Sequence, residues 1–295
     1  QRIEQAPLRY DPTTQSIQYE ASYLQAKDFH RVGRKSNLWS NFAFIEGGLE
    51  FRPNKTSILK VSGEFSYSLG KSGSVSSMLL NNDNNGETEQ YEYQVQADFT
   101  QKLSSDKGSS KIKDVMLQLV GSYQKSYGES YNKDFKDDYF RYGHIGTFNT
   151  YKRPTYALTK MDIDGDGYEE YVYQQNGWLD YRVDFTPSDD NAGLAAYTSQ
   201  LYNDEMFADY RSSLINYTNI RSMYGLVNGD ITGSIYGLYS NVGVPVTGYS
   251  KSESQQIYAT ATLSATIGRH ILELGFQYDQ AIYRSYSLAA GGLWT

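Results

Sequence analysis

Cysteine is absent from all 295 residues, which excludes disulfide bonds and zinc sites built from thiolates. Long hydrophobic runs are missing too: no stretch approaches the roughly 18 apolar residues of a transmembrane helix, and the mean hydropathy is −0.62. Basic residues are in deficit, with 27 Lys and Arg against 34 Asp and Glu and a net charge of −7. This balance argues against a nucleic-acid partner, because no basic stripe is present to neutralise phosphates.

The chain opens on QRIEQAPLRY and shows no signal peptide, so we expect a mature or truncated piece of a longer protein. Tyrosine is plentiful, with 29 Tyr beside 12 Phe and 26 Gly. Tyr, Ser, Gly and Asn favour strands and hairpins, whereas Leu, Ile and Val are too sparse for a large α/β core. A membrane stays possible, because a spanning strand needs only about 9–11 residues and every second one faces lipid.

Apolar and polar side chains alternate over two neighbouring stretches near the end of the chain. The apolar set runs from Ile257 to Ala265 and resumes from Leu272 to Ile282, on either side of Gly268. A period of two places one set on each face of a sheet, and Gly268 supplies the positive φ that a tight hairpin needs. The same pattern predicts further strands at residues 17–23, 43–51, 59–69, 91–99 and 115–123.

Connection lengths also alternate. Those at Pro53, at residues 104–111 and at Gly268 are short or modest, and those after Leu24, Leu69 and Tyr123 are longer. Short turns on one side and long loops on the other are typical of an outer-membrane barrel, although a soluble meander has the same period.

The predicted fold is therefore all-β, as part of a transmembrane antiparallel β-barrel with long, partly structured extracellular loops. Residues 1–125 would supply the first strands and loops, and residues 255–295 a barrel hairpin and the start of the next loop. Strand direction makes residues 126–254 one large extracellular excursion, or a segment with an even number of further spans. We favour a structured excursion, because a loop of that length needs structure of its own. The candidate strands in it are residues 139–148, 170–173 and 181–185.

These strands are one short of the roughly eight in the smallest bacterial barrels. An open edge in lipid would leave backbone groups unpaired. We therefore expect this chain to form part of a larger barrel.

The sharpest local motif is DIDGDGYEE. Asp162, Asp164 and Asp166 hold positions one, three and five, the backbone carbonyl of Tyr168 position seven and Glu170 position nine. Oxygens at this spacing suit Ca²⁺, which takes about six to eight oxygen ligands. We interpret the loop as a structural calcium site that resembles the short DxDxDG loops of extracellular β-proteins. An EF-hand would need an acid where this loop has a tyrosine, and a solvated acidic turn is the alternative, since Asp and Gly alone favour turns.

Motifs for catalysis are not found. His30, His144 and His270 are far apart in sequence and match no metal-binding spacing. No phosphate loop, nucleophile elbow or identifiable carboxylate pair is present. We predict that the protein is not an enzyme and that His270, in a turn, is exposed to solvent.

The tyrosines fall into two groups. One lies near candidate strand ends, where amphipathic rings favour a membrane interface: Tyr91, Tyr93, Tyr123, Tyr127, Tyr278 and Tyr283. The other belongs to the excursion, where such rings either form a ligand platform or, as we favour, pack the loops: Tyr139, Tyr142, Tyr151, Tyr156, Tyr171, Tyr173 and Tyr181.

One distinctive segment is DYFRYGHIGTFNTYKRPTY, residues 138–156. This segment resembles the Oar-like TonB-dependent receptors of the Bacteroidota, of the type that carries a carboxypeptidase-regulatory-like domain. Looser matches spread over most of the chain, at residues 183–188, 196–202, 225–229, 284–288 and 292–295.

The resemblance implies an outer-membrane receptor with extracellular loops, about 22 strands and a plugged lumen, powered by an inner-membrane TonB complex. The regulatory-like domain, TonB box, plug and remaining strands of that family are not in this sequence, so the TonB complex would act through the missing N-terminal part. Outer-membrane lipid, an unknown ligand and other surface proteins are the expected partners. The acidic loop is not a fixed feature of the family.

Two alternatives stay open. One is a secreted, calcium-stabilised β-protein that binds a glycan or a protein, and solubility without detergent would favour it. The other is a structural barrel subunit of a larger surface or secretion assembly, which co-purification with stoichiometric partners would favour.

Overall fold

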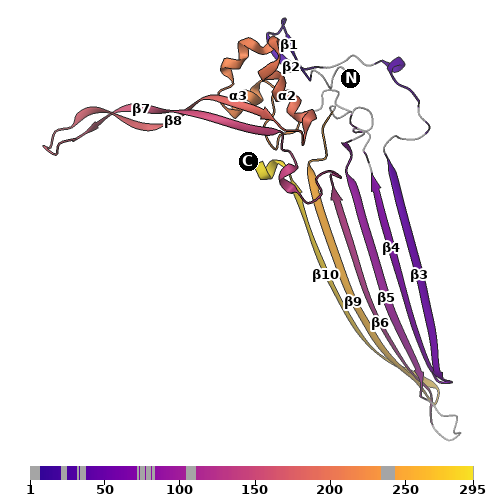
Figure 1. Ribbon diagram of the computed structural model, residues 1–295. Coiled ribbons are helices and arrows are strands. Elements are labelled where there is room, and N and C mark those ends of the chain that lie inside the picture. Colours follow the sequence, from indigo (N-terminus) through magenta and orange to yellow (C-terminus); the bar gives the residue numbers. More distant parts are fainter. Residues whose placement is uncertain are drawn as a thin grey trace.

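The computed structural model describes residues 7–20, 25–31, 33, 38–71, 73, 77, 81, 84–103, 111–233 and 243–294. Its largest element is a six-stranded antiparallel sheet in the order β10-β9-β6-β5-β4-β3 (Figure 1). The strands are long: β3 (Trp39–Asn54), β4 (Ser57–Lys71), β5 (Glu87–Lys102), β6 (Ile112–Tyr131), β9 (Gly248–Ile267) and β10 (His270–Ala289).

The alternating stretches form these strands as predicted, and each strand is longer than its alternating core. The tight turns β3–β4 and β9–β10 lie at one end of the sheet, and the second of them contains Gly268 at φ +64 (Figure 1). The predicted connection at 104–111 joins β5 to β6 at that same end, and its residues 104–110 lie outside the described part of the chain. The prediction of mostly antiparallel β-structure is confirmed.

The region between β6 and β9 is a single excursion, because these two strands pair directly with each other from Ile112↔Ile267 to Ser130↔Ser250. In the described part of the chain, β3 and β10 each pair with only one strand, so the sheet is open at both edges. No helix among the described residues has the length and apolarity needed to cross a membrane.

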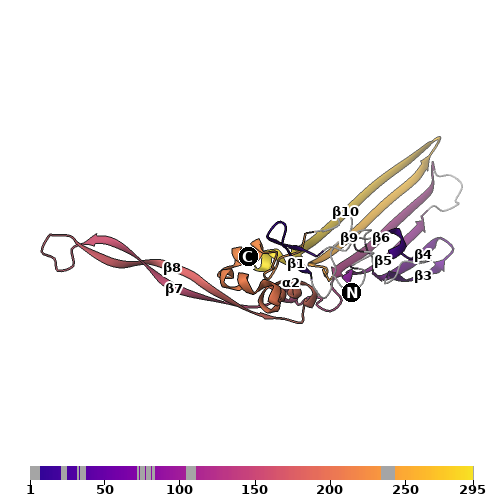
Figure 2. The same cartoon turned by 90° about the horizontal axis from the view of Figure 1, so that it is seen from above.

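Two strands of the excursion form a separate ribbon, β7 (Gly146–Met161) with β8 (Glu170–Pro187). Both views show this ribbon leaving the body sideways, across the direction of the sheet strands (Figures 1 and 2). The predicted strands at 170–173 and 181–185 belong to β8. The predicted strand at 139–148 is corrected: residues 139–141 form the short 3-10 helix η3 (Tyr139–Arg141), and β7 begins only at Gly146.

A compact module lies above the sheet, beside the base of the ribbon (Figure 1). It contains α2 (Ala192–Asn203), η4 (Glu205–Ser213) and α3 (Tyr217–Ser222), together with the hairpin of β1 (Leu8–Asp11) and β2 (Ser16–Tyr19). Its core is formed by buried side chains from the hairpin, the base of the ribbon, the helices and the segment after α3: Leu8, Ile17, Ile145, Val183, Leu194, Ala195, Tyr197, Leu201, Phe207, Leu214, Ile220, Leu226 and Val227.

The predicted strand at 17–23 is therefore wrong as a barrel strand. β2 pairs with β1 and not with β3, and Ile17 is buried in the core of the module. Residues 21–24 lie outside the described part of the chain. The short helices η1 (Ala26–Asp28) and α4 (Gly291–Trp294) complete the fold.

Candidate functional site

The first candidate is the apolar face of the six-stranded sheet. The registers place apolar residues of every strand side by side, for example in the row Phe51, Leu59, Phe99, Leu119, Ala261 and Phe276. Nothing in the described part of the chain covers this face: Leu49 is 81% exposed, Ile45 69% and Phe276 66%. Soluble monomers rarely expose apolar patches larger than about 300–600 Å². Water is therefore an unfavourable solvent for this surface, at a cost of about 25 cal/mol per Å².

Aromatic side chains mark the upper limit of the apolar face. Tyr67, Tyr91 and Tyr127 are cross-strand neighbours in one row, and the last two rings stack with centroids 4.8 Å apart. The hydroxyl of Tyr67 donates to Glu89 (2.9 Å) and that of Tyr127 to Glu129 (2.6 Å), so the face becomes polar at this level. Rings with one apolar and one wet end suit a membrane interface.

The other tyrosines predicted for the interface divide between the two faces. Tyr93, Tyr123 and Tyr278 lie on the apolar face, where their neighbours are Phe65 and Ala259 among others. Tyr283 pairs with Ser254 and lies on the opposite face. All of them lie within the strands, because the strands extend further than the alternation predicts.

The opposite face of the sheet is mostly polar, although Phe42 and Phe44 of β3 and Ile271 of β10 also lie on it. Its cross-strand contacts are amide–carboxylate hydrogen bonds, such as Gln118 to Asp98 (3.1 Å), Gln124 to Glu92 (2.6 Å) and Gln256 to Asp279 (2.9 Å). The sheet therefore has one apolar face and one mostly polar face.

The acidic loop is the tip of the ribbon. Carboxylate oxygens of Asp162, Asp164 and Asp166 lie within 4.8 Å of one another, and all three residues are exposed. Asp162 accepts the amides of Gly165 (2.7 Å) and Gly167 (3.0 Å), which curls the loop around it. These three of the predicted calcium ligands are thus brought together.

The other two predicted ligands are less closely tied to this group. Glu170 begins β8, and its carboxylate accepts the amide of Ile163 at 3.4 Å. Tyr168 donates its amide to Asp166 (2.9 Å), and its side chain is exposed. Its carbonyl remains a predicted ligand.

A second cluster of polar side chains surrounds Asp190, and no local sequence motif predicts it. Asp190 accepts from Arg141 Nε (2.9 Å) and pairs with His144 Nδ1 (2.9 Å). Burial raises the pKa of Asp190, but hydrogen bonds from His144, Arg141 and Ser188 outweigh burial, so its pKa lies below the usual 3.8. His144 also stacks on Trp294, with ring centroids 5.4 Å apart. This cluster joins the start of the excursion to α4.

A recess of about 660 Å³ opens next to this cluster, between β7, α3 and the end of the described chain. The guanidinium of Arg221, which lines the recess, donates to both carboxylate oxygens of Asp230 at 2.8 and 3.0 Å. The side-chain amide of Asn228, also in the lining, accepts from the Ile145 amide and donates to the Gly146 carbonyl. The recess offers aromatic faces rather than free charge.

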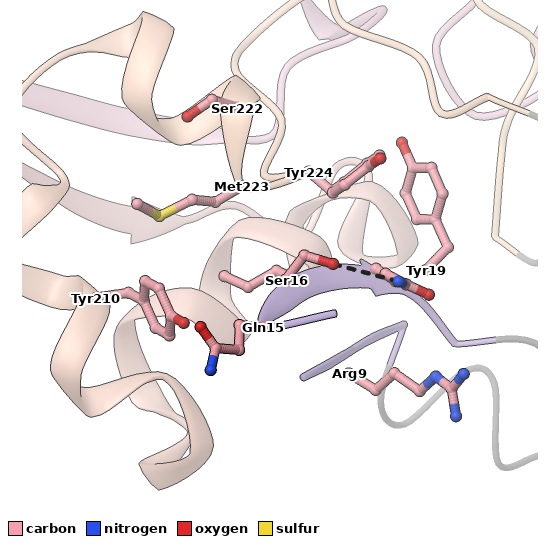
Figure 3. Close-up of a pocket in the computed structure, with 10 residues that line it drawn as sticks. Arg9, Gln15, Ser16, Tyr19, Tyr210, Ser222, Met223 and Tyr224 are labelled. Atoms are coloured by element: carbon pink, nitrogen blue, oxygen red, sulfur yellow. Dashed lines mark hydrogen bonds between the residues drawn. The ribbon is translucent and has the colours of Figure 1, made fainter. Parts of the chain in front are cut away.

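A larger recess, of about 740 Å³, lies between the β1–β2 hairpin and the helices (Figure 3). Tyr210 and Met223 line one side of it, and Gln15 and Ser16 lie between them and Arg9. Arg9, the one charged residue among the described residues of the lining, lies 3.9 Å from the carboxylate of Glu20. The aromatic rings and uncharged donors and acceptors of the rest of the lining suit a polar, uncharged ligand. The alternating residues of β2 gave no sign of this recess, since it forms only when α3 and η4 pack beside them.

The tyrosines of the excursion do not gather in one place. Tyr142 is fully buried and accepts the Asn132 amide (2.9 Å). Tyr139 packs its ring against Tyr249, and its hydroxyl forms a hydrogen bond with that of Tyr286 (2.9 Å). The other five lie exposed along the ribbon: Tyr151, Tyr156, Tyr171, Tyr173 and Tyr181.

The three histidines lie in separate surroundings. His30 and His270 are exposed, the latter at the start of β10 beside the turn, as predicted. His144 alone belongs to a cluster, the one around Asp190.

Comparisons of this chain with protein-family models, with curated proteins and with solved structures found no match.

Proposed function

We propose that this chain is barrel wall and surface module of an outer-membrane receptor of the TonB-dependent, Oar-like type. In this proposal the sheet spans the outer membrane with its apolar face in lipid, and the excursion lies outside the cell. The receptor recognises or takes up a ligand at the surface and catalyses no reaction.

The observation that carries the proposal is the uncovered apolar face that continues across all six strands. Between Leu59 and Tyr67, β4 provides the length that a spanning strand needs, about 9–11 residues. The row of Tyr67, Tyr91 and Tyr127 lies at one border of this band, as in the aromatic girdles of membrane barrels. The sequence resemblance to the receptor family supports the same assignment.

The open edges agree with a larger barrel. Among the described residues, no strand pairs with the outer edge of β3 or of β10, and lipid cannot satisfy the backbone donors and acceptors of such an edge. In the proposal, further barrel strands pair with both edges. The TonB complex acts through parts of the receptor that this sequence does not contain.

Ligand recognition is assigned to the surface module. Its two recesses are lined mostly by aromatic and uncharged polar groups. A neutral, polar ligand fits these linings better than an ion, because Arg221 and His144 are already paired with Asp230 and Asp190.

We also propose that the tip of the ribbon binds Ca²⁺ and that this cation stabilises the loop. Three crowded carboxylates repel one another unless a cation neutralises them. Terbium, which replaces calcium and emits when excited through a nearby tyrosine, provides the probe, because Tyr168 lies in the loop. We expect Asp162→Asn and Asp164→Asn to weaken terbium binding at least tenfold. Glu169→Gln, a charge-matched control in the same loop, should bind nearly as well as the parent protein; equal loss in all three variants would contradict a defined site.

Topology on whole cells tests the receptor proposal. The chain has no native cysteine, so single cysteines report one position each. A membrane-impermeant maleimide should label Ile163→Cys, at the ribbon tip, on intact cells. It should label Lys55→Cys and Arg269→Cys, in the short turns, only after the outer membrane is opened. Equal labelling of all three on intact cells, or recovery of the protein in the soluble fraction, would refute the proposal.

A further inference from the structure

The larger recess follows the outer edge of β2. Five consecutive residues, from Gln15 to Tyr19, line it. Successive side chains of a strand point to opposite faces, so a cavity beside one face would meet only every second residue. An uninterrupted run therefore places the strand edge, with its backbone amides and carbonyls, along the recess. Tyr210 of η4 and Met223, just after α3, line another side of it (Figure 3).

Hydrogen bonds of the hairpin show which backbone groups of β2 point to this edge. Leu8, the partner of Tyr19, donates its amide to Gln200 (2.8 Å) and accepts from Gln200 at its carbonyl (2.7 Å), so both groups point away from β2. Both residues of such an antiparallel pair turn their backbone groups outward, and every second pair repeats this arrangement. Tyr19 and Ile17 therefore direct their amides and carbonyls away from β1, to the outer edge of β2.

The two outer edges of the hairpin differ in how they are covered. At the outer edge of β1, Gln200 binds the backbone, and the amide of Tyr10 donates to Met206 Sδ (3.3 Å). At the outer edge of β2, no described residue forms a hydrogen bond with the backbone amide or carbonyl of Ile17 or Tyr19. The recess thus offers outward-pointing backbone donors and acceptors from two residues of one strand.

Two residues around the recess adopt a backbone conformation that favours glycine. Gln15 has φ +50 and Tyr224 has φ +62, and they are two of the four non-glycine residues with positive φ in the described part of the chain. A bulky side chain makes this conformation costly, and such strain collects at ligand sites, where the surrounding structure maintains it. The strained turn after α3 holds the ring of Tyr224 against that of Tyr19, with centroids 4.8 Å apart, beside the open edge of β2.

We propose that this recess binds an extended, uncharged peptide, which pairs as a third strand with the outer edge of β2. This inference rests on the proposed assignment of ligand recognition to the surface module and names the class of ligand. Strand addition takes its affinity from main-chain hydrogen bonds and its specificity from side-chain pockets. The backbone of Ile17 and Tyr19 supplies the hydrogen bonds, and the side chains of Tyr210, Met223 and Tyr224 form the pocket.

The edge of β2 selects a peptide among uncharged ligands. Its outward-pointing groups recur at every second residue, about 6.8 Å apart along the strand, and an extended peptide carries complementary groups at the same repeat. Arg9 is the one charged residue in the described lining, and the carboxylate of Glu20 lies 3.9 Å from it. Charged peptide side chains would therefore find no unpaired charge among the described lining residues. The volume of about 740 Å³ falls within the usual range of ligand sites, about 300–1,000 Å³.

Binding of synthetic peptides to the purified full chain tests the pairing. The probe is a fluorescent pool of capped peptides, about six residues long, randomised over serine, threonine, glutamine, valine and tyrosine. A pool methylated on every second backbone amide keeps one free edge and should bind nearly as well as the parent pool. A pool methylated on every amide has the same side chains and no donors, and should bind at least tenfold more weakly. Equal affinity of the two methylated pools, or no binding of the parent pool, would overturn the proposal.

Hydrogen exchange in the complex locates the peptide. The amide of Gln18 points to β1, whereas those of Ile17 and Tyr19 point to the recess. The bound pool should slow exchange of Ile17 and Tyr19 at least tenfold and change that of Gln18 much less. Slowing confined to residues outside the recess would contradict pairing at this edge.

The variant Tyr224→Asn tests the side-chain part of the recess. Asparagine tolerates the left-handed backbone, so the fold is kept while the ring is lost, and we expect the pool to bind several-fold more weakly. Tyr173→Asn removes an exposed tyrosine of the ribbon and is the matched control, which should bind like the parent protein. Equal binding by the two variants would contradict the role of the recess.

The position of the sheet is measured independently, by cysteine labelling on whole cells. Peptide binding is measured on purified protein and does not depend on that result. Loss of peptide binding with labelling as expected would refute the peptide site alone. Peptide binding with the opposite labelling would refute the receptor proposal alone.

Discussion

Asp190 is the residue that ties the excursion together at its base. Its carboxylate forms hydrogen bonds with the side chains of Arg141 and His144. These two residues belong to the segment before β7, whereas Asp190 lies just before α2. Neighbouring Asn191 donates to the backbone carbonyls of Arg141 and His144, at 2.9 and 2.8 Å. Two segments far apart in sequence are therefore joined by side chains of adjacent residues. No spacing rule could have predicted this cluster.

The pKa of Asp190 gives a prediction about pH. Since its pKa is lowered by folding, its carboxylate stabilises the folded module above the usual pKa of 3.8, and this contribution is lost as the pH falls through the still lower folded pKa. At neutral pH, Asp190→Asn should cost about 1–2 kcal/mol, a charged hydrogen-bond contribution reduced for partial exposure. Hydrogen exchange of residues 188–198 measures the loss. The gap between variant and parent should close as the pH falls below 3.8, and a gap that widens there would contradict this role.

At the scale of the elements, β2 pairs with β1 in the module and not with the six-stranded sheet, because its apolar side chain is buried in the module core. Its alternating residues suit a barrel strand, but Ile17 and Leu8 lie in the core of the module with Leu194 and Leu201. Leu8 is also held by Gln200, which accepts its amide (2.8 Å) and donates to its carbonyl (2.7 Å). The hairpin is thus part of the surface module.

This placement is testable with one substitution. Ile17→Asp puts a charge into the core, and we expect the module to lose about 3 kcal/mol or more. Limited proteolysis should then cut residues 192–230 readily, while the heat-modifiable gel migration of the sheet persists. Thr13→Asp, in the exposed turn of the same hairpin, is the control. If Ile17→Asp disrupted the sheet and spared the module, β2 would belong to the barrel after all.

The long strands were predictable because alternation over many residues has one physical meaning, a sheet with two different faces. β7 was harder to predict, since Lys152, Arg153 and Pro154 interrupt its apolar series. The helices of the excursion were not predicted from the sequence either. The buried positions of α2 do follow helical spacing, at Leu194, Ala195, Tyr197, Thr198 and Leu201, so this element could have been found from the sequence.

The candidate sites also differ in how far the sequence alone predicts them. The acidic loop is local, so its three aspartates were predictable from spacing. The faces of the ribbon are set by the pairing of β7 with β8 and by the bulge at Asn176, and the recesses form only when the module packs. These features depend on contacts between distant residues, which a single sequence does not specify.

At the scale of the whole molecule, three surfaces divide the proposed work. In the receptor proposal, the apolar face of the sheet lies in lipid and the mostly polar face lines the lumen. The module above it provides the recesses, and the ribbon extends sideways from the body (Figure 2). The apolar face of the sheet and the exposed aromatic side chains of the ribbon are unfavourable in water. The recesses of the module carry polar groups able to bind a ligand.

The most direct measurement of the central claim is a fluorescence scan of β4 in outer-membrane vesicles. An environment-sensitive fluorophore is attached at Val61→Cys and Phe65→Cys on the apolar face, and at Ser62→Cys and Glu64→Cys on the polar face. We predict blue-shifted emission that lipid-soluble quenchers reduce at 61 and 65, and emission that aqueous quenchers reduce at 62 and 64. If all four positions responded alike to the aqueous quencher, the sheet would not lie in a membrane and the receptor proposal would be wrong.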